Sequence, residues 1–106
     1  PNEEHAASVI KAGSLEIDTA GHRVSRNGQA LSLSPKEFDL LSFLVLNRGQ
    51  VFGRETLVEK LWGYNHEGTG RTVDVHSRWL RRKIENTPAQ PEHLLTVHGF
   101  GYKFEG

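Results

Sequence analysis

The stretch GRTVDVHSRWLRRKIE, residues 70–85, decides the fold that this chain is expected to adopt. At roughly 100° per residue, its apolar side chains recur at the spacing of an amphipathic helix. Val73, Leu80 and Ile84 fall on one face with Ser77 among them, and we expect this face to pack against a core. The opposite face is basic around one small apolar residue and consists of Arg71, Val75, Arg78 and Arg82.

This basic face has two interpretations. Arginines spaced about one turn apart suit a DNA major groove, because a guanidinium group can fork onto guanine or phosphate and a valine can meet a thymine methyl. Basic helix faces are also often only solvated surface, so the face by itself leaves both alternatives open. The shoulders of the basic face are Thr72 and Trp79 on one side and Asp74 and Arg81 on the other.

Length and composition limit the alternatives. The chain has 106 residues, 36% hydrophobic and 25% charged, which predicts one domain with a modest core. It has no cysteine, which excludes disulfides and thiolate metal sites. No run approaches the ~18 apolar residues of a membrane span, and no signal-peptide pattern opens the chain. The net charge is zero, but residues 71–83 carry five basic side chains against Asp74, a local charge of +4.

The first third of the chain predicts a small sheet. Residues 1–8, PNEEHAAS, lack periodicity and are expected to be a linker remnant from a missing N-terminal partner domain. Short strands are expected at residues 9–12, 15–18, 23–26 and 30–33. Asn27-Gly28 is the clearest hairpin signal between them, since both residues tolerate positive φ. These strands predict an antiparallel meander.

Two helices are expected next. Ser34 can cap the first, Pro35 suits its first turn, and Glu37 completes a capping box. Gly49 lies where a C-terminal stop for this helix is expected. The second helix covers residues 54–62 and should begin less firmly, because Gly53 is a poor cap. The following loop, residues 63–70, is either a plain connector or a contact surface. Its Thr69 is the expected cap of the third helix.

A hairpin closes the chain. After Glu85, two prolines in NTPAQPE end the third helix, and residues 94–98 and 102–104 read as strands around the turn Gly99-Phe100-Gly101. Three helices followed by such a hairpin predict a winged helix-turn-helix of the α+β class. Its recognition helix would span about residues 70–86 and its wing about residues 94–104, within one domain over residues 9–106.

The sequence closely resembles the DNA-binding domain of OmpR/PhoB-type response regulators. The match rests on RTVDVHSRWLRRKIE followed by LTVHGFGYKFEG, and LSLSPKEFDLLSFLVLNRGQVF and RETLVEKLWG extend it to residues 9–105. The resemblance implies sequence-specific binding to double-stranded promoter DNA for transcription regulation, with the third helix in the major groove and the wing at the minor groove. It also implies a bacterial cytoplasmic protein of a two-component system, with an N-terminal receiver phosphorylated by a sensor kinase.

The resemblance further implies partners and site residues. Dimers would bind head-to-tail on direct repeats, and RNA polymerase would meet the loop through Tyr64, Asn65, His66 and Glu67. Phosphate contacts are implied for Arg71, Thr72, His76 and Arg81, a flanking contact for Trp62, and groove-facing positions for Val75 and Arg78. Three residues depart from the family's pattern: Trp79 replaces a basic base-reading residue, His98 replaces an arginine at the wing tip, and Ser77 replaces a buried aliphatic residue.

Other kinds of function find little support. The chain has six histidines, but no two have the i, i+4 spacing that places imidazoles on one helical face, so no metal site or cofactor is expected. It has no cysteine nucleophile, P-loop or G-x-S-x-G, so we expect no enzyme. The remaining alternative is a winged helix used for protein docking. The arginines of the third helix argue against this alternative, because a docking surface has little need of them. The promoter, the kinase and the direction of regulation stay open.

Overall fold

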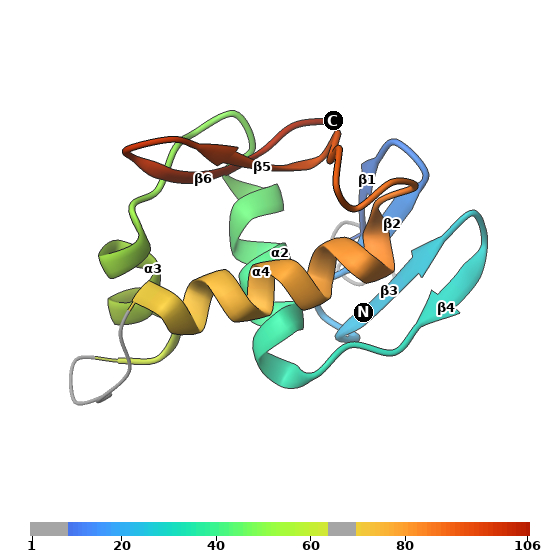
Figure 1. Cartoon of the computed structure of the whole chain (residues 1–106). Coiled ribbons are helices and arrows are strands. Elements are labelled where there is room, and N and C mark those ends of the chain that lie inside the picture. Colours follow the sequence, from blue (N-terminus) through green and yellow to red (C-terminus); the bar gives the residue numbers. More distant parts are fainter. Residues whose placement is uncertain (1–8, 64–69) are drawn as a thin grey trace.

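A computed structural model describes residues 9–63 and 70–106 of the chain (Figure 1). It confirms an α+β winged helix-turn-helix, with a four-stranded antiparallel sheet, three helices and a C-terminal hairpin. The expected linker at residues 1–8 and the expected cap Thr69 lie outside the described residues. The elements are β1 (Val9–Ala12), β2 (Leu15–Asp18), β3 (Arg23–Arg26), β4 (Gln29–Leu31), α2 (Pro35–Leu46), α3 (Arg54–Leu61), α4 (Gly70–Ile84), β5 (Leu94–Val97) and β6 (Gly101–Phe104).

The N-terminal sheet is a meander in the order β1-β2-β3-β4. Asn27 and Gly28 have φ values of 52° and 81°, so they form the predicted tight turn between β3 and β4. The bounds expected for the last strand, residues 30–33, were wrong, because β4 begins one residue earlier and ends at Leu31. Its last expected residue, Leu33, instead packs against the core just before the cap of α2.

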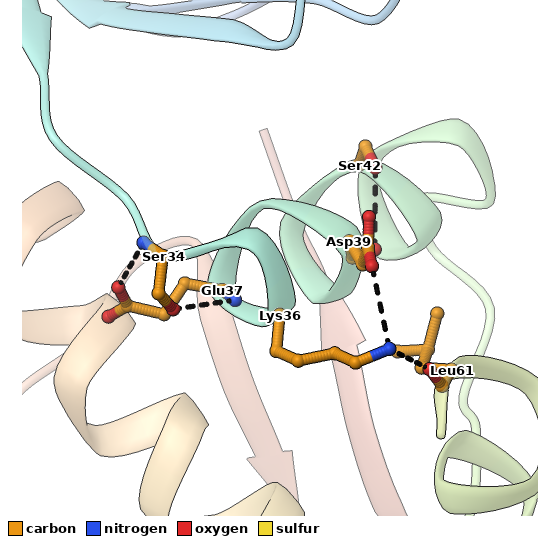
Figure 2. Close-up of polar contacts among 6 residues, drawn as sticks. All are labelled: Ser34, Lys36, Glu37, Asp39, Ser42 and Leu61. Atoms are coloured by element: carbon orange, nitrogen blue, oxygen red, sulfur yellow. Dashed lines mark hydrogen bonds and ion pairs between the residues drawn. The ribbon is translucent and has the colours of Figure 1, made fainter. Parts of the chain in front are cut away.

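The first helix, α2, begins with the predicted capping box (Figure 2). Ser34 Oγ accepts a hydrogen bond from the Glu37 amide at 3.2 Å, and Glu37 Oε1 accepts one from the Ser34 amide at 2.8 Å. Lys36 in the same turn reaches α3, since its Nζ donates to the Leu61 carbonyl at 2.5 Å. The same Nζ lies 3.8 Å from Asp39 Oδ2 within α2. A cation at the last carbonyls of α3 is favourably placed against the helix dipole.

The other two helices differ from expectation only at their ends. Helix α3 ends at Leu61, with Trp62 as its C-cap, and Gly53 provides no side-chain hydrogen bond at its start, as expected. Helix α4 ends at Ile84 rather than residue 86, although the Glu85 amide still donates to the Arg81 carbonyl at 2.9 Å. Helix ends are the least predictable part of a sequence pattern, because the last turn depends on what receives its free groups.

The core confirms which face of α4 is inward. Val73, Leu80 and Ile84 are buried together with Ser77, and α4 packs on both α2 and α3. The wing strands β5 and β6 pair antiparallel, and Tyr102 of β6 also pairs with Phe52, which lies between α2 and α3. The first wing strand ends one residue before the expected residue 98, and the second begins one residue earlier than expected. In Figure 1 the hairpin runs along α4, and its tip lies near the start of α3.

Polar contacts attach the C-terminal end of α4 to the rest of the domain. Lys83 Nζ lies 2.7 Å from Glu37 Oε1, a carboxylate that is almost fully buried. Burial alone would raise the pKa of Glu37, but the hydrogen bonds from Lys83 and Ser34 outweigh it and hold the pKa below its ordinary value of 4.5. Arg26 of β3 donates to the Lys83 carbonyl at 3.5 Å and to the Asn86 side chain. The C-terminal end of α4 is therefore joined to both α2 and the sheet.

Candidate nucleic-acid interface

The outward face of α4 presents the basic residues that its periodicity predicts. Arg71, Arg78 and Arg82 are exposed, whereas Val75 between them is half-buried. Trp79, on the shoulder of this face, is 44% exposed. The helix therefore offers both guanidinium groups and an aromatic surface to a partner.

A groove runs between α4 and the wing. Arginines of α4 form one wall, the wing forms the other, and the start of α3 contributes Arg54 and Thr56. The groove brings together four of the residues that the sequence singled out, which are Arg78, Arg81, Arg82 and His98. Three others, Trp62, His76 and Trp79, gather on another side of α4.

Arg81 has a structural task that the sequence did not reveal. Its Nε donates to the Leu94 carbonyl at 2.8 Å, and its Nη2 donates to Thr96 Oγ1 at 2.7 Å. The guanidinium carbon also lies 5.6 Å from the centre of the Tyr102 ring. Because both acceptors are neutral, the guanidinium group keeps its positive charge in the groove while the two bonds fix the wing to α4.

Asp74 joins three elements beside the basic face. Its Oδ1 accepts a hydrogen bond from the Tyr102 hydroxyl at 2.5 Å, and its Oδ2 lies 3.2 Å from Arg54 Nη2. Burial and the bond to this carboxylate raise the pKa of Tyr102 to about 12. Arg54 offsets the negative charge of Asp74, so that α3, α4 and β6 meet at a neutral pair rather than at an isolated carboxylate.

The raised pKa of Tyr102 predicts alkaline sensitivity. An unfolded tyrosine ionises near pH 10, whereas Tyr102 in the fold ionises at about 12, so the folded state retains a proton that the unfolded state has lost. The free energy of unfolding should therefore fall between pH 10 and 12, by up to about 2–3 kcal/mol. Urea titrations at pH 8, 10 and 11 should show a smaller loss for Tyr102→Phe than for the parent. Identical slopes in Tyr102→Phe and the parent would contradict this assignment.

The other side of α4 carries an aromatic row. The ring centre of His76 lies 5.1 Å from that of Trp62 and 5.1 Å from that of Trp79. His76 Nδ1 donates to the Thr72 carbonyl at 2.8 Å, which leaves Nε2 as the ring nitrogen directed elsewhere. Lys36 Nζ lies 5.6 Å from the Trp62 ring. Three residues predicted to contact DNA thus form one packed cluster.

The pairing of charges changes the local charge that the sequence indicates. Lys83 forms its ion pair with the buried Glu37, and Asp74 forms its ion pair with Arg54. Neither therefore contributes a full unbalanced charge to the surface of α4. The positive field of the helix rests mainly on its arginines.

Two other features are absent from the described part of the chain. Within residues 9–63 and 70–106, no three histidine or acidic residues gather as a metal site would require. In the same residues, no helix has the length and apolar character needed to cross a bilayer.

The comparison with known families decides what this fold is. Residues 28–104 match the family described as "Transcriptional regulatory protein, C terminal". The chain belongs to this family. Its relatives identify the OmpR/PhoB type, because the response regulator DrrB of Thermotoga maritima, an OmpR/PhoB homologue, superimposes with a TM-score of 0.87 at 35% identity. That match covers 93% of this chain and 45% of DrrB.

Two further relatives place this OmpR/PhoB-type domain more closely. It is 46% identical over 102 residues to the DNA-binding response regulator MtrA of Mycolicibacterium smegmatis, covering 96% of this chain but only 45% of MtrA. The DNA-binding domain of Klebsiella pneumoniae RstA, solved in complex with the RstA box, superimposes with a TM-score of 0.82 at 35% identity. It is matched over 92% of this chain and 96% of that domain. The family is one of transcriptional regulators and not of enzymes.

The sequence did not predict the polar contacts that join α3, α4 and β6 beside the basic face. Arg54, Asp74 and Tyr102 come from three elements, and no short-range spacing links them. Sequence reasoning also did not single out Phe100, which lines the groove, although an aromatic residue between two glycines in a tight turn is a usable signal. The predicted polymerase-contact residues Tyr64, Asn65, His66 and Glu67 lie outside the described residues.

Proposed function

We propose that this OmpR/PhoB-type domain binds double-stranded promoter DNA sequence-specifically, with α4 in the major groove and the wing at the minor groove. The observation that carries the proposal is the row of exposed arginines on α4, which faces away from the core beside a groove that the wing completes. An α-helix fits the major groove, and arginine binds both phosphate and guanine. The fold shared with the RstA DNA-binding domain, which was solved in complex with the RstA box, supports DNA binding by this domain.

Within this proposal, the residues divide by their position on α4. Arg71 and Thr72 stand in the first turn, where side chains and free amide groups meet phosphate. Val75 and Arg78 lie farther along the helix and would meet base edges, with Trp79 stacking beside them. The remaining contacts would be to the sugar–phosphate backbone and come from Trp62, His76, Arg81, Arg82 and His98.

Salt dependence tests DNA binding against the docking alternative. Each neutralised phosphate releases counterions, so log K for a duplex should fall by about 0.9 per phosphate contact for each unit of log salt. Four to six contacts, as an order-of-magnitude figure, would give a slope of roughly −4 to −5. Fluorescence anisotropy with a random duplex and with a site selected from a random pool measures both slopes. An affinity that hardly changes between dilute and physiological salt would favour protein docking.

Two arginines should separate specificity from positioning. Arg78→Ala should weaken binding to the selected site by about 1–3 kcal/mol and affect a scrambled duplex much less, because base contacts carry sequence preference. Arg71→Ala should weaken both duplexes by similar factors and lower the salt slope by about one unit, because phosphate contacts do not read sequence. Four titrations at matched salt make the comparison. Equal losses for Arg78→Ala on both duplexes would make Arg78 a phosphate clamp.

We extend the proposal to the whole protein by analogy with relatives such as MtrA, of which this chain covers 45%. The domain would be the output module of a bacterial cytoplasmic response regulator, with residues 1–8 as the link to a receiver. Head-to-tail dimers on direct repeats and contact of Tyr64, Asn65, His66 and Glu67 with RNA polymerase belong to the same proposal. A receiver that brings two copies together should make the full protein bind a two-site duplex more tightly than this domain does. Equal affinities of the full protein and this domain for the two-site duplex would contradict this role of the receiver.

A further inference from the structure

The tip of the wing carries an exposed aromatic side chain that the contacts above do not use. Phe100 is 73% exposed, the highest value among the exposed large hydrophobic side chains of the described residues. It lines the same groove as Arg78 and His98. A single exposed phenylalanine is not unusual, so its position in the lining of a basic groove is the informative fact.

The backbone holds Phe100 firmly on both sides. Its amide donates to the Val97 carbonyl at 2.9 Å, which closes a turn with Gly99 at φ 84°. On the other side, Gly101 is so close to Phe52 that a Cβ built there would lie 1.9 Å from the Phe52 carbonyl oxygen. Because these contacts already fix the backbone of the tip, ordering it on binding would cost little, and only the Phe100 side chain would lose conformational freedom.

We propose that Phe100 is an apolar wedge that enters the minor groove and partly unstacks one base-pair step beside the footprint of α4. The inference rests on the proposed DNA binding and deepens it. Phenylalanine is one of the side chains that proteins insert between base steps from the minor groove. The tip itself, residues 97–101, has no acidic side chain that phosphates would repel.

A wedge predicts a particular kind of specificity. Pyrimidine–purine steps such as TpA are the most easily unstacked, whereas A-tracts are stiff. The domain should therefore prefer a TpA step at the position of the wing, although no hydrogen bond reads the bases there. This preference would add to the base contacts of α4 and would be lost with the side chain of Phe100.

The test uses the 106-residue chain and a selected duplex in which one TpA step is moved through the base pairs that flank the footprint of α4. Replacing adenine in that step by 2-aminopurine reports unstacking as a rise in fluorescence. The parent should bind one placement best and raise its fluorescence. Phe100→Ala should bind that duplex about tenfold more weakly, the effect of losing one aromatic contact with the bases, and should show neither the preference nor the rise. Phe100→Leu should keep the preference, because it keeps an apolar wedge.

A matched control removes a different exposed apolar side chain. Leu46 is 63% exposed at the end of α2 and does not line the groove, so Leu46→Ala should behave as the parent. Equal affinity of Phe100→Ala and the parent on every placement would overturn the wedge while leaving DNA binding intact. A loss seen only on a two-site duplex would also overturn it and assign Phe100 to contact between copies. Absence of binding by the parent to every duplex would instead overturn the proposed function, and the wedge with it.

Discussion

Glu85→Ala is expected to lower the free energy of unfolding by about 2–4 kcal/mol, because several backbone amides lose a charged acceptor at once. Glu85 is 3% exposed, and its carboxylate accepts hydrogen bonds from the amides of Glu92 at 2.9 Å, His93 at 3.0 Å and Leu94 at 2.8 Å. These amides belong to the residues just before and at the start of β5. A carboxylate after the C-terminus of α4 is poorly placed against the helix dipole, so the amides must outweigh that cost.

Glu85→Gln distinguishes this role from simple packing. Glutamine has nearly the same volume, but its amide group presents N–H donors to backbone donors. If Glu85 only filled space, the Gln variant would be as stable as the parent. We expect it instead to lose most of what Glu85→Ala loses, as measured by urea unfolding at pH 7. Heteronuclear NMR should place the largest shift changes at the start of β5.

Gly101→Ala is expected to be at least as damaging, at about 3 kcal/mol or more. A Cβ at this position would lie 1.9 Å from the Phe52 carbonyl oxygen and 2.8 Å from Gly53 Cα, and these are backbone atoms that cannot move aside by changing rotamer. Phe52 and Tyr102 exchange two hydrogen bonds of 2.9 Å next to this contact, and both would be disturbed. The wing would then separate from the segment at Phe52 between α2 and α3.

Gly99→Ala is the matched control for Gly101→Ala. Gly99 also has a positive φ, 84°, but a Cβ there would meet nothing within 4 Å. It should therefore cost only the backbone strain, about 1–2 kcal/mol. Denaturant unfolding of the two variants side by side measures the difference. Equal losses would show that the left-handed backbone matters and that the approach to Phe52 does not.

The sequence was sufficient to predict features that depend on residues close together in the chain. The capping box of Ser34 and Glu37 spans three residues, and the turn at Asn27-Gly28 joins adjacent ones, so both follow from residue type and spacing. The inward face of α4 follows in the same way, since its apolar residues recur with the helical period. The basic outward face is the other side of that same pattern.

The tertiary structure alone decided which groups far apart in the chain would meet. Tyr102 and Asp74 are 28 residues apart, and Lys83 and Glu37 are 46 residues apart, yet each pair is hydrogen-bonded. No period or motif links such residues, because their meeting depends on how α2, α4 and the wing pack around one core. The same packing decided that Arg81 bonds to the wing and that Lys83 neutralises a buried carboxylate. Sequence therefore determined which face of α4 is basic, and the fold determined which of its charges remain for a partner.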